Sequence, residues 1–196
     1  MNTPLYTIGY ATKPIEIFIS QLQQHGITVV ADIRSVPYSN AFFDYHQEAI
    51  IEHLNSHGIR YVYLGDELGP RSKDPAHYDD SGQIQFDRLM ASALFTQGIQ
   101  RLAKGQQRGF TIALMCAEKD PATCHRSLLV GYFLNRHSEQ VIEHIHHDGT
   151  TETQIKLEQR LCQIHDMEAD LFLSPQQRQQ QAYELQLKQT SYRKPE

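Results

Sequence analysis

The chain has little cysteine, which occurs three times in 196 residues. A small, odd number in a chain of this size argues against a scaffold stabilised by disulfides. No run of about eighteen apolar residues is present, and that is the length a helix needs to span a membrane. The start, MNTPLYTIGY, has no basic segment followed by a long apolar one, as a signal peptide would have. These absences predict a cytoplasmic protein that does not enter a membrane.

An excess of positive charge is also missing, since the formal net charge is −5. Nucleic-acid-binding domains usually carry a basic face. The charge therefore does not favour a broad nucleic-acid interface, although it permits a local basic pocket. Hydrophobic residues make up 40% of the chain, enough for the core of one domain with an appendage.

Short apolar runs alternate with segments of helical periodicity along residues 1–150. Strands are expected at Leu5–Gly9, Ile27–Ile33, Ile59–Gly65, Phe110–Cys116 and Val141–His147. Helices are expected at Pro14–His25 (capped by Thr12), Gln47–His57, Phe86–Lys104 (interrupted near Gly98) and Ser127–Arg136. Asp66–Gln85 is expected to be a long loop. The alternation predicts an α/β domain: about five mainly parallel strands with helices on both faces, in a three-layer Rossmann-like or flavodoxin-like arrangement.

The chain changes character after residue 150. Thr153–Met167 indicates one more helix. From Ser174 the sequence is rich in glutamine and weakly apolar, which is typical of a solvent-exposed helix or of a disordered tail. We expect residues 151–196 to form a helical, glutamine-rich extension, with disorder as an open alternative for about the last twenty residues.

Small and polar residues follow each expected strand. Ligands of open parallel sheets bind beyond the carboxyl ends of the strands, so these residues are candidates for a binding site. Asp32 and Arg34 alternate along a strand end and can therefore face the same side and pair. Arg71 follows the third strand in the turn-rich segment GDELGPR. The candidate ligand contacts selected at these strand ends are Gly9, Tyr10, Asp32, Arg34, Ser35, Gly65 and Gly69.

The segment LMCAEKDPATCHRSLLV, residues 114–130, holds two of the three cysteines. Cys116 lies at the mouth of the most apolar strand. Asp120-Pro121 is a turn signal, and a helix beginning at Pro121 or Thr123 would place Cys124 in its first turn. A helix N-terminus presents free N–H groups and partial positive charge, which favour an anion and lower the pKa of a thiol.

One hypothesis makes the protein an enzyme, a cysteine-dependent transferase or hydrolase. The ligand would be small and anionic: phosphorylated, nucleotide-like or carboxylated. The proposed roles are nucleophile for Cys116 or Cys124, proton transfer for Glu118 and His125, and anion binding for Arg34 and Arg126.

Other hypotheses remain open for the same segment. Cys116, Cys124 and His125 could bind a metal, but seven residues separate the cysteines where two to four are usual, so no metal ligand is selected. The two cysteines could form a reversible disulfide if their Cα atoms come within about 7 Å. The cysteines could also be inert, in a non-catalytic module that binds a nucleotide or a nucleic-acid phosphate. The sequence indicates no cofactor and no oligomeric state.

An ordered set of motifs carries a family resemblance. TIGY, DIRSVPYS, GIRYVYLGDELGPR and LMCAEKDPATCHR together resemble the family of domains of unknown function numbered 488, over roughly residues 5–147. The resemblance implies an α/β domain with a polar cleft and no defined reaction. Members commonly have Gly-His-Ser after the first strand, where this chain has Gly9-Tyr10-Ala11. The family pattern falls on Gly9, Asp32, Arg34, Ser35, Pro37, Leu64, Gly65, Leu68, Gly69, Cys116, Glu118, Cys124, His125 and Arg126.

Overall fold

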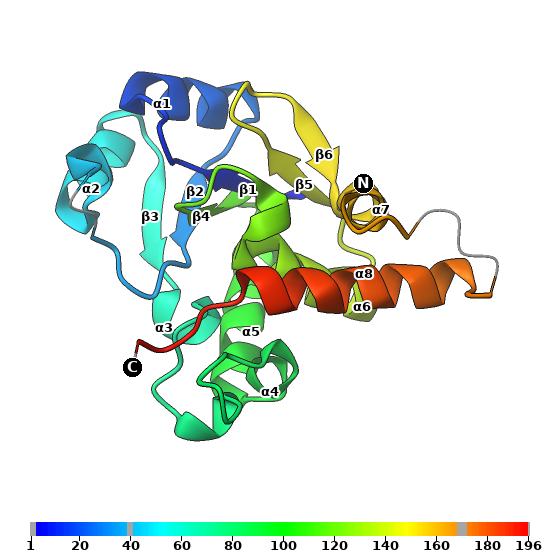
Figure 1. Cartoon of the computed structure of the whole chain (residues 1–196). Coiled ribbons are helices and arrows are strands. Elements are labelled where there is room, and N and C mark those ends of the chain that lie inside the picture. Colours follow the sequence, from blue (N-terminus) through cyan, green and yellow to red (C-terminus); the bar gives the residue numbers. More distant parts are fainter. Residues whose placement is uncertain (1–2, 39–40, 168–171, 196) are drawn as a thin grey trace.

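Six strands form one sheet in the computed structural model, which describes residues 3–38, 41–167 and 172–195 (Figure 1). The strand order is β3-β2-β4-β1-β5-β6. All neighbouring pairs run parallel except β5 and β6, which are antiparallel. The strands are β1 Leu5–Gly9, β2 Val29–Asp32, β3 Arg60–Tyr63, β4 Ile112–Cys116, β5 Ile142–Ile145 and β6 Thr151–Thr153. The expected parallel strands are confirmed, and β6 is an addition.

The described part of the chain also contains eight α-helices and four 3-10 or π-helical segments, and α7 and α8 follow the last strand. The α-helices are α1 Ile15–Gln24, α2 Gln47–Ser56, α3 Gly65–Leu68, α4 Phe86–Met90, α5 Ala93–Gln107, α6 Tyr132–His137, α7 Gln154–Ile164 and α8 Pro175–Thr190. The other helical segments are the 3-10 turns η1 Phe43–Tyr45, η2 Pro75–His77 and η3 Pro121–Thr123, and the π-helical turn η4 Arg126–Gly131. None of the described helices is both long enough and apolar enough to cross a membrane.

Helices cover both faces of the sheet, as expected for an α/β domain. In β4, Ala113 and Met115 pack into the cluster formed with α1 and α2. Ile112 and Leu114 pack into the cluster that includes α5, α6, α7 and α8. Figure 1 shows α1 and α2 on one side of the strands and α5, α6 and α8 on the other. Successive side chains of a strand point to opposite faces, so this double coverage explains the nearly continuous apolar sequence of β4.

The helix expected over Phe86–Lys104 is broken, but not at Gly98. It divides between α4 and α5, where the Ser92 side chain accepts a hydrogen bond from the Phe95 backbone N–H and caps α5. Gly98 lies inside α5. A Cβ at this position would meet Leu68 Cδ2 of α3 at 2.7 Å. Glycine at this position therefore permits close packing of α5 on α3 and does not end the helix.

Two further expectations are wrong in detail. Thr12 does not cap α1: it has a left-handed φ of 59°, and the residue before the helix is Pro14, which makes no side-chain capping bond. The segment expected as a long loop contains α3 and η2. In η2, the Asp74 carboxylate accepts from the Ala76 backbone N–H, an arrangement that a polar, proline-containing sequence can form locally.

The C-terminal extension is helical and packs on the domain. Ala182 and Tyr183 of α8 are buried, and the Tyr183 hydroxyl donates to the Leu128 carbonyl. The Gln186 amide donates to the Ala122 carbonyl at 2.6 Å. The tail was expected to be either helical or disordered, and residues Pro175–Thr190 form the helix α8. The buried face of α8 contacts the segment that carries the second cysteine. Residues 168–171 and 196 of the extension lie outside the described residues.

Candidate functional site

The candidate site begins at the carboxyl end of β4, a central strand of the sheet. Cys116 is the last residue of β4 and pairs in register with Gly9 of β1. Its carbonyl accepts a hydrogen bond from the Tyr10 backbone N–H at 3.1 Å. Cys116 is buried, with 1% of its surface exposed. The strand therefore holds this thiol at a fixed place on the sheet edge.

A pinned turn brings the second cysteine back to the first. The Asp120 carboxylate accepts from the Ala122 backbone N–H at 2.9 Å and forms an ion pair with Arg160 of α7. The turn continues through η3, which Pro121 begins with its fixed φ. Although burial opposes it, Arg160 lowers the pKa of Asp120, so the carboxylate stays ionised at neutral pH. Sequence-distant α7 thus fixes the path of the loop.

Cys124 precedes the helix and does not lie within its first turn. Its backbone is extended, with φ −125° and ψ 142°, and its carbonyl accepts from the backbone N–H groups of Ser127 and Leu128. The helix then opens as the π-helical turn η4, so the expected α-helical N-terminus is not formed at the thiol. The Arg126 backbone N–H still points at Cys124 Sγ, at 3.5 Å.

Four side chains converge at this edge: Cys116, Glu118, Cys124 and His125. Their ligand atoms all lie within 4.8 Å of one another, and they form the one such group of His, Cys, Asp and Glu in the described residues. The two Sγ atoms are 2.9 Å apart. Glu118 Oε2 lies 2.5 Å from Cys116 Sγ and 3.1 Å from Cys124 Sγ. We call these four residues the Cys–Glu–His cluster.

The orientation of His125 is set by a backbone carbonyl. Its Nε2 lies 2.9 Å from the carbonyl oxygen of Ile33, at the end of β2. A carbonyl only accepts, so Nε2 carries the hydrogen and donates it. Nδ1 then faces the two Sγ atoms, at 3.6 Å from Cys116 and 3.8 Å from Cys124. In the neutral imidazole, the Nδ1 lone pair is therefore directed into the cluster.

The four members of the cluster differ in exposure. Cys116, Cys124 and His125 are buried, whereas Glu118 is exposed and turns its carboxylate inward to the sulfurs. Burial, reinforced by the Cys116 thiol, raises the pKa of Cys124 well above its usual value. Although burial opposes it, His125 and the thiols lower the pKa of Glu118. At neutral pH the cluster thus combines an ionised carboxylate with a protonated Cys124 thiol.

Arg126 and Gly9 hold the loop that carries Glu118. Arg126 is fully buried, and its guanidinium donates to the backbone carbonyls of Glu118 and Lys119, at 2.6 Å and 3.2 Å. A Cβ at Gly9 would lie 1.9 Å from the Glu118 carbonyl oxygen. Two residues selected as ligand contacts therefore shape the cluster through the backbone of its loop.

Arg34 is also held by other residues of the protein. It forms a bidentate ion pair with Asp32, at 2.9 Å and 2.6 Å, as the alternation along the strand suggested. Its third nitrogen donates to the Tyr45 carbonyl and to the hydroxyl of Tyr10, which stacks on the Tyr45 ring. Together with the Asp32 contacts to the Tyr61 hydroxyl, this network joins β1, β2 and β3 at the sheet edge.

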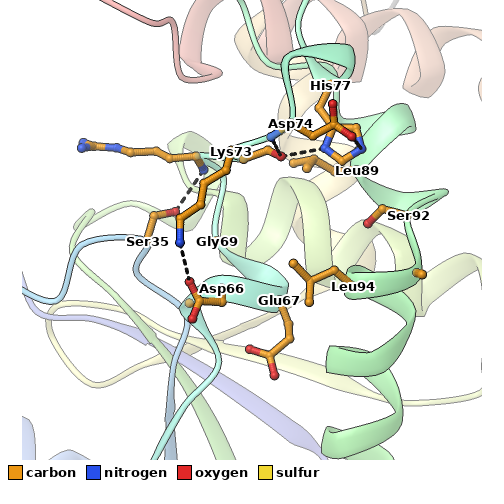
Figure 2. A pocket seen from close by; sticks show the side chains of 14 residues that line it. Ser35, Asp66, Glu67, Gly69, Lys73, Asp74, His77, Leu89, Ser92 and Leu94 are labelled. Carbon is orange, nitrogen blue, oxygen red and sulfur yellow. Dashed lines mark hydrogen bonds and ion pairs between the residues drawn. The ribbon is translucent and has the colours of Figure 1, made fainter.

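The remaining strand-end candidates lie on another pocket. Ser35, Gly65 and Gly69 line a cavity of about 630 Å³, which Figure 2 shows with Asp66, Glu67 and Lys73 around it. Ser35 Oγ accepts from the Arg71 backbone N–H at 3.0 Å. A Cβ at Gly69 would meet Ser35 Oγ at 2.3 Å, and one at Gly65 would meet the Arg34 carbonyl at 2.0 Å. Both glycines permit the close approach of these turns.

A smaller pocket adjoins the cluster and involves residues that sequence reasoning did not select. It has a volume of about 180 Å³, and Glu118 and His125 form part of its wall. Arg71 and the C-terminal Tyr192 line it as well. Arg71 had a weak signal, its place in a turn after the third strand. Tyr192 had none, because its position depends on how the tail folds back.

Comparison with known proteins identifies the family. No curated protein and no solved structure matches the chain. The family model described as "Domain of unknown function DUF488" matches residues 14–133, which include the whole Cys–Glu–His cluster. This match covers more than half of the 196 residues and agrees with the resemblance carried by the motifs. The chain is a member of the DUF488 family.

Proposed function

We propose that the protein binds one thiophilic divalent cation, with Zn²⁺ as the preferred ion, through Cys116, Glu118, Cys124 and His125. The observation that carries the proposal is the convergence of four ligand atoms within 4.8 Å on a buried sheet edge. Two sulfurs, one imidazole nitrogen and one carboxylate oxygen form a donor set that zinc accepts in four-coordinate sites. Thiolate donors favour zinc or iron over magnesium and calcium.

The outer contacts of the cluster also support a metal. Metal-binding histidines usually donate their second ring N–H to a carbonyl or carboxylate, which fixes the tautomer. His125 does so to the Ile33 carbonyl at 2.9 Å. Arg126 holds the backbone carbonyls of Glu118 and Lys119, and Asp120 holds the turn that follows them. These contacts preorganise the ligands before an ion arrives.

The spacing of the sulfurs is close to what an ion requires. Metal–sulfur bonds of about 2.3 Å at a tetrahedral centre place two sulfurs about 3.8 Å apart. The observed separation is 2.9 Å. A change of about 0.9 Å is within reach of side-chain rotation about Cys χ1. Metal binding would also displace the proton that the Cys124 thiol holds, so zinc uptake releases acid.

The earlier hypotheses differ in their support. Arg34 and Arg126 are engaged by Asp32 and by backbone carbonyls, which weakens their assignment as anion-binding residues. A nucleotide- or nucleic-acid-phosphate-binding module built on them loses support for the same reason. An enzyme that acts on a small anion remains the proposed class, with the metal in place of a free thiolate as its reactive centre. We propose the cytosol as its compartment, where thiols stay reduced.

Cobalt binding tests the proposal. Co²⁺ titrated into metal-free protein should saturate at one ion per chain and give the intense near-ultraviolet absorption of cobalt–thiolate bonds. Cys116→Ser and Cys124→Ser should each lose most of this absorption and bind Co²⁺ at least tenfold more weakly, because each removes a ligand. Cys162→Ser is the matched control, since Cys162 is also buried but lies outside the cluster.

The variants distinguish a bound metal from its absence. Equal absorption in all three variants would contradict the proposal, as would saturation far below one ion per chain. Circular dichroism of each variant shows whether a loss of binding reflects unfolding. If Cys116→Ser unfolds, the Cys124→Ser variant and the wild type still decide the matter, because only a bound thiolate produces the charge-transfer band.

The 2.9 Å separation of the sulfurs favours a second function, a redox-active cysteine pair. With hydrogen peroxide as oxidant, the two thiols form one disulfide and the peroxide leaves as two molecules of water, so two electrons pass from sulfur to oxygen. Metal-free protein treated with hydrogen peroxide should lose two mass units, with the bond mapped to Cys116 and Cys124. Bound Zn²⁺ should slow this reaction. Oxidation to sulfinic acid without a disulfide would exclude the pair as a redox device.

A further inference from the structure

Glu118 differs from the other three ligands of the proposed metal centre. Cys116, Cys124 and His125 are buried, and each is fixed by β4, by the turn or by the Ile33 carbonyl. Glu118 is exposed and reaches the sulfurs from the side of the small pocket. Two cysteines and one histidine with an exchangeable fourth position form a pattern of catalytic zinc sites, whereas structural sites are closed.

The pocket beside Glu118 is small. Its volume of about 180 Å³ corresponds to roughly six water molecules. Glu118, Thr123 and His125 line it, together with the C-terminal residues Thr190, Ser191 and Tyr192. It therefore has room for an anion of a few non-hydrogen atoms.

Arg71 supplies an available cation at this pocket. Its guanidinium lies 4.7 Å from the centre of the Tyr192 ring, a contact that orients the group without neutralising it. Its side chain is exposed and forms no ion pair with any carboxylate of the described residues. Arg34 and Arg126, by contrast, are buried and engaged.

The position of Tyr192 is itself fixed. Its carbonyl accepts from the Ile84 backbone N–H at 2.9 Å, and the Lys194 backbone N–H donates to the Gly82 carbonyl at 2.9 Å. The C-terminal segment is thus tied along residues 82–84 and holds the aromatic face against which Arg71 rests. Arg71 is oriented by a segment more than one hundred residues away in the sequence.

We infer that the small pocket binds a small oxyanion, with a carboxylate or a phosphate group, between the metal and Arg71. One oxygen of the anion replaces the Glu118 carboxylate on the metal, and a second oxygen pairs with the Arg71 guanidinium. A monoanionic oxygen ligand then replaces another on the metal, while the displaced Glu118 carboxylate stays in the pocket and the Arg71 guanidinium offsets the charge that the anion brings. This inference rests on the proposed metal centre and adds its ligand class, its exchangeable position and its anion-binding residue.

The test uses the full-length protein loaded with Co²⁺, probed with inorganic phosphate and with acetate. Binding at the metal changes the visible absorption of Co²⁺, so either anion should give a saturable spectral change in the wild type. Arg71→Gln should raise the dissociation constant of that anion about tenfold or more, because a charged hydrogen bond is lost. It should leave Co²⁺ affinity unchanged. Arg108→Gln, an exposed arginine outside this pocket, is the matched control.

Failure of the two proposals can be told apart. If the protein takes up no Co²⁺, the metal centre and this inference both fall. If it takes up Co²⁺ but neither anion changes the spectrum, only this inference falls. If Arg71→Gln and Arg108→Gln weaken anion binding equally, Arg71 does not hold the anion and the inference is overturned.

Discussion

Individual residues of the cluster could be found from the sequence because they lie within ten positions of one another. Cys116, Glu118, Cys124 and His125 were selected from a single segment. Their joint arrangement could not be found, because the orientation of His125 depends on the carbonyl of Ile33, the residue that follows β2. The seven residues between the cysteines argued against a metal site. The sequence does not show that the turn folds back and brings the two sulfurs to 2.9 Å from each other.

Gly9 provides a test at this scale. A methyl group added there would lie 1.9 Å from the Glu118 carbonyl oxygen, a backbone atom that cannot move without the loop. Gly9→Ala should lower the free energy of unfolding by about 1–3 kcal/mol, the usual cost of overpacking, and weaken Co²⁺ binding. Urea denaturation and cobalt titration measure the two effects.

The control for Gly9→Ala is Gly105→Ala in α5. There the nearest atom is Ile112 Cδ1 at 2.8 Å, the movable end of a side chain, and alanine favours the helix. This variant should change the free energy of unfolding by less than about 1 kcal/mol and leave cobalt binding intact. A Gly9→Ala protein as stable as the wild type, with normal cobalt affinity, would contradict the packing argument.

At the scale of elements, periodicity predicted the five parallel strands and most of the helices. It did not predict β6, because Thr-Glu-Thr is too short to show a pattern. It left α8 between helix and disorder, since the apolar face of that helix is narrow: Ala182 and Tyr183 are its buried apolar residues, with the amide Gln186 beside them. A polar residue such as Gln186 gives no sign in the sequence that it is buried, because its partner Ala122 is distant in the chain.

Gln186 offers a prediction about the docking of α8. Its amide donates to the Ala122 carbonyl, in the turn that precedes Cys124. Gln186→Leu should lower the free energy of unfolding by about 1–3 kcal/mol, because the buried carbonyl loses its partner. Gln189→Leu, on the exposed side of the same helix, should change it by about 0.5 kcal/mol or less. Equal effects of the two substitutions in chemical denaturation would show that the amide contact does not stabilise the fold.

At the scale of the whole molecule, a buried histidine links stability to pH. His144 of β5 is bonded to Thr7 and Gln154, and burial lowers its pKa to about 3. The unfolded chain therefore binds a proton below the usual pKa of about 6.5, while the folded chain does not. The free energy of unfolding consequently falls as the pH is lowered through this range.

The size of this effect can be measured against a variant. Between about pH 7.5 and 4.5 the His144 contribution should be about 2–3 kcal/mol. His144→Gln removes the titrating group, so its stability should vary less with pH in this window, whatever its absolute stability. Denaturation of metal-free protein at several pH values gives both curves. Parallel curves for wild type and variant would contradict a neutral, buried His144.

The central claim is the metal centre, and X-ray absorption at the metal edge tests it most directly. Full-length protein loaded with Zn²⁺ should contain one ion per chain. The coordination sphere should hold two sulfurs at about 2.3 Å and two nitrogen or oxygen atoms at about 2.0–2.1 Å. A coordination sphere without sulfur, or protein that retains no stoichiometric zinc, would contradict the account.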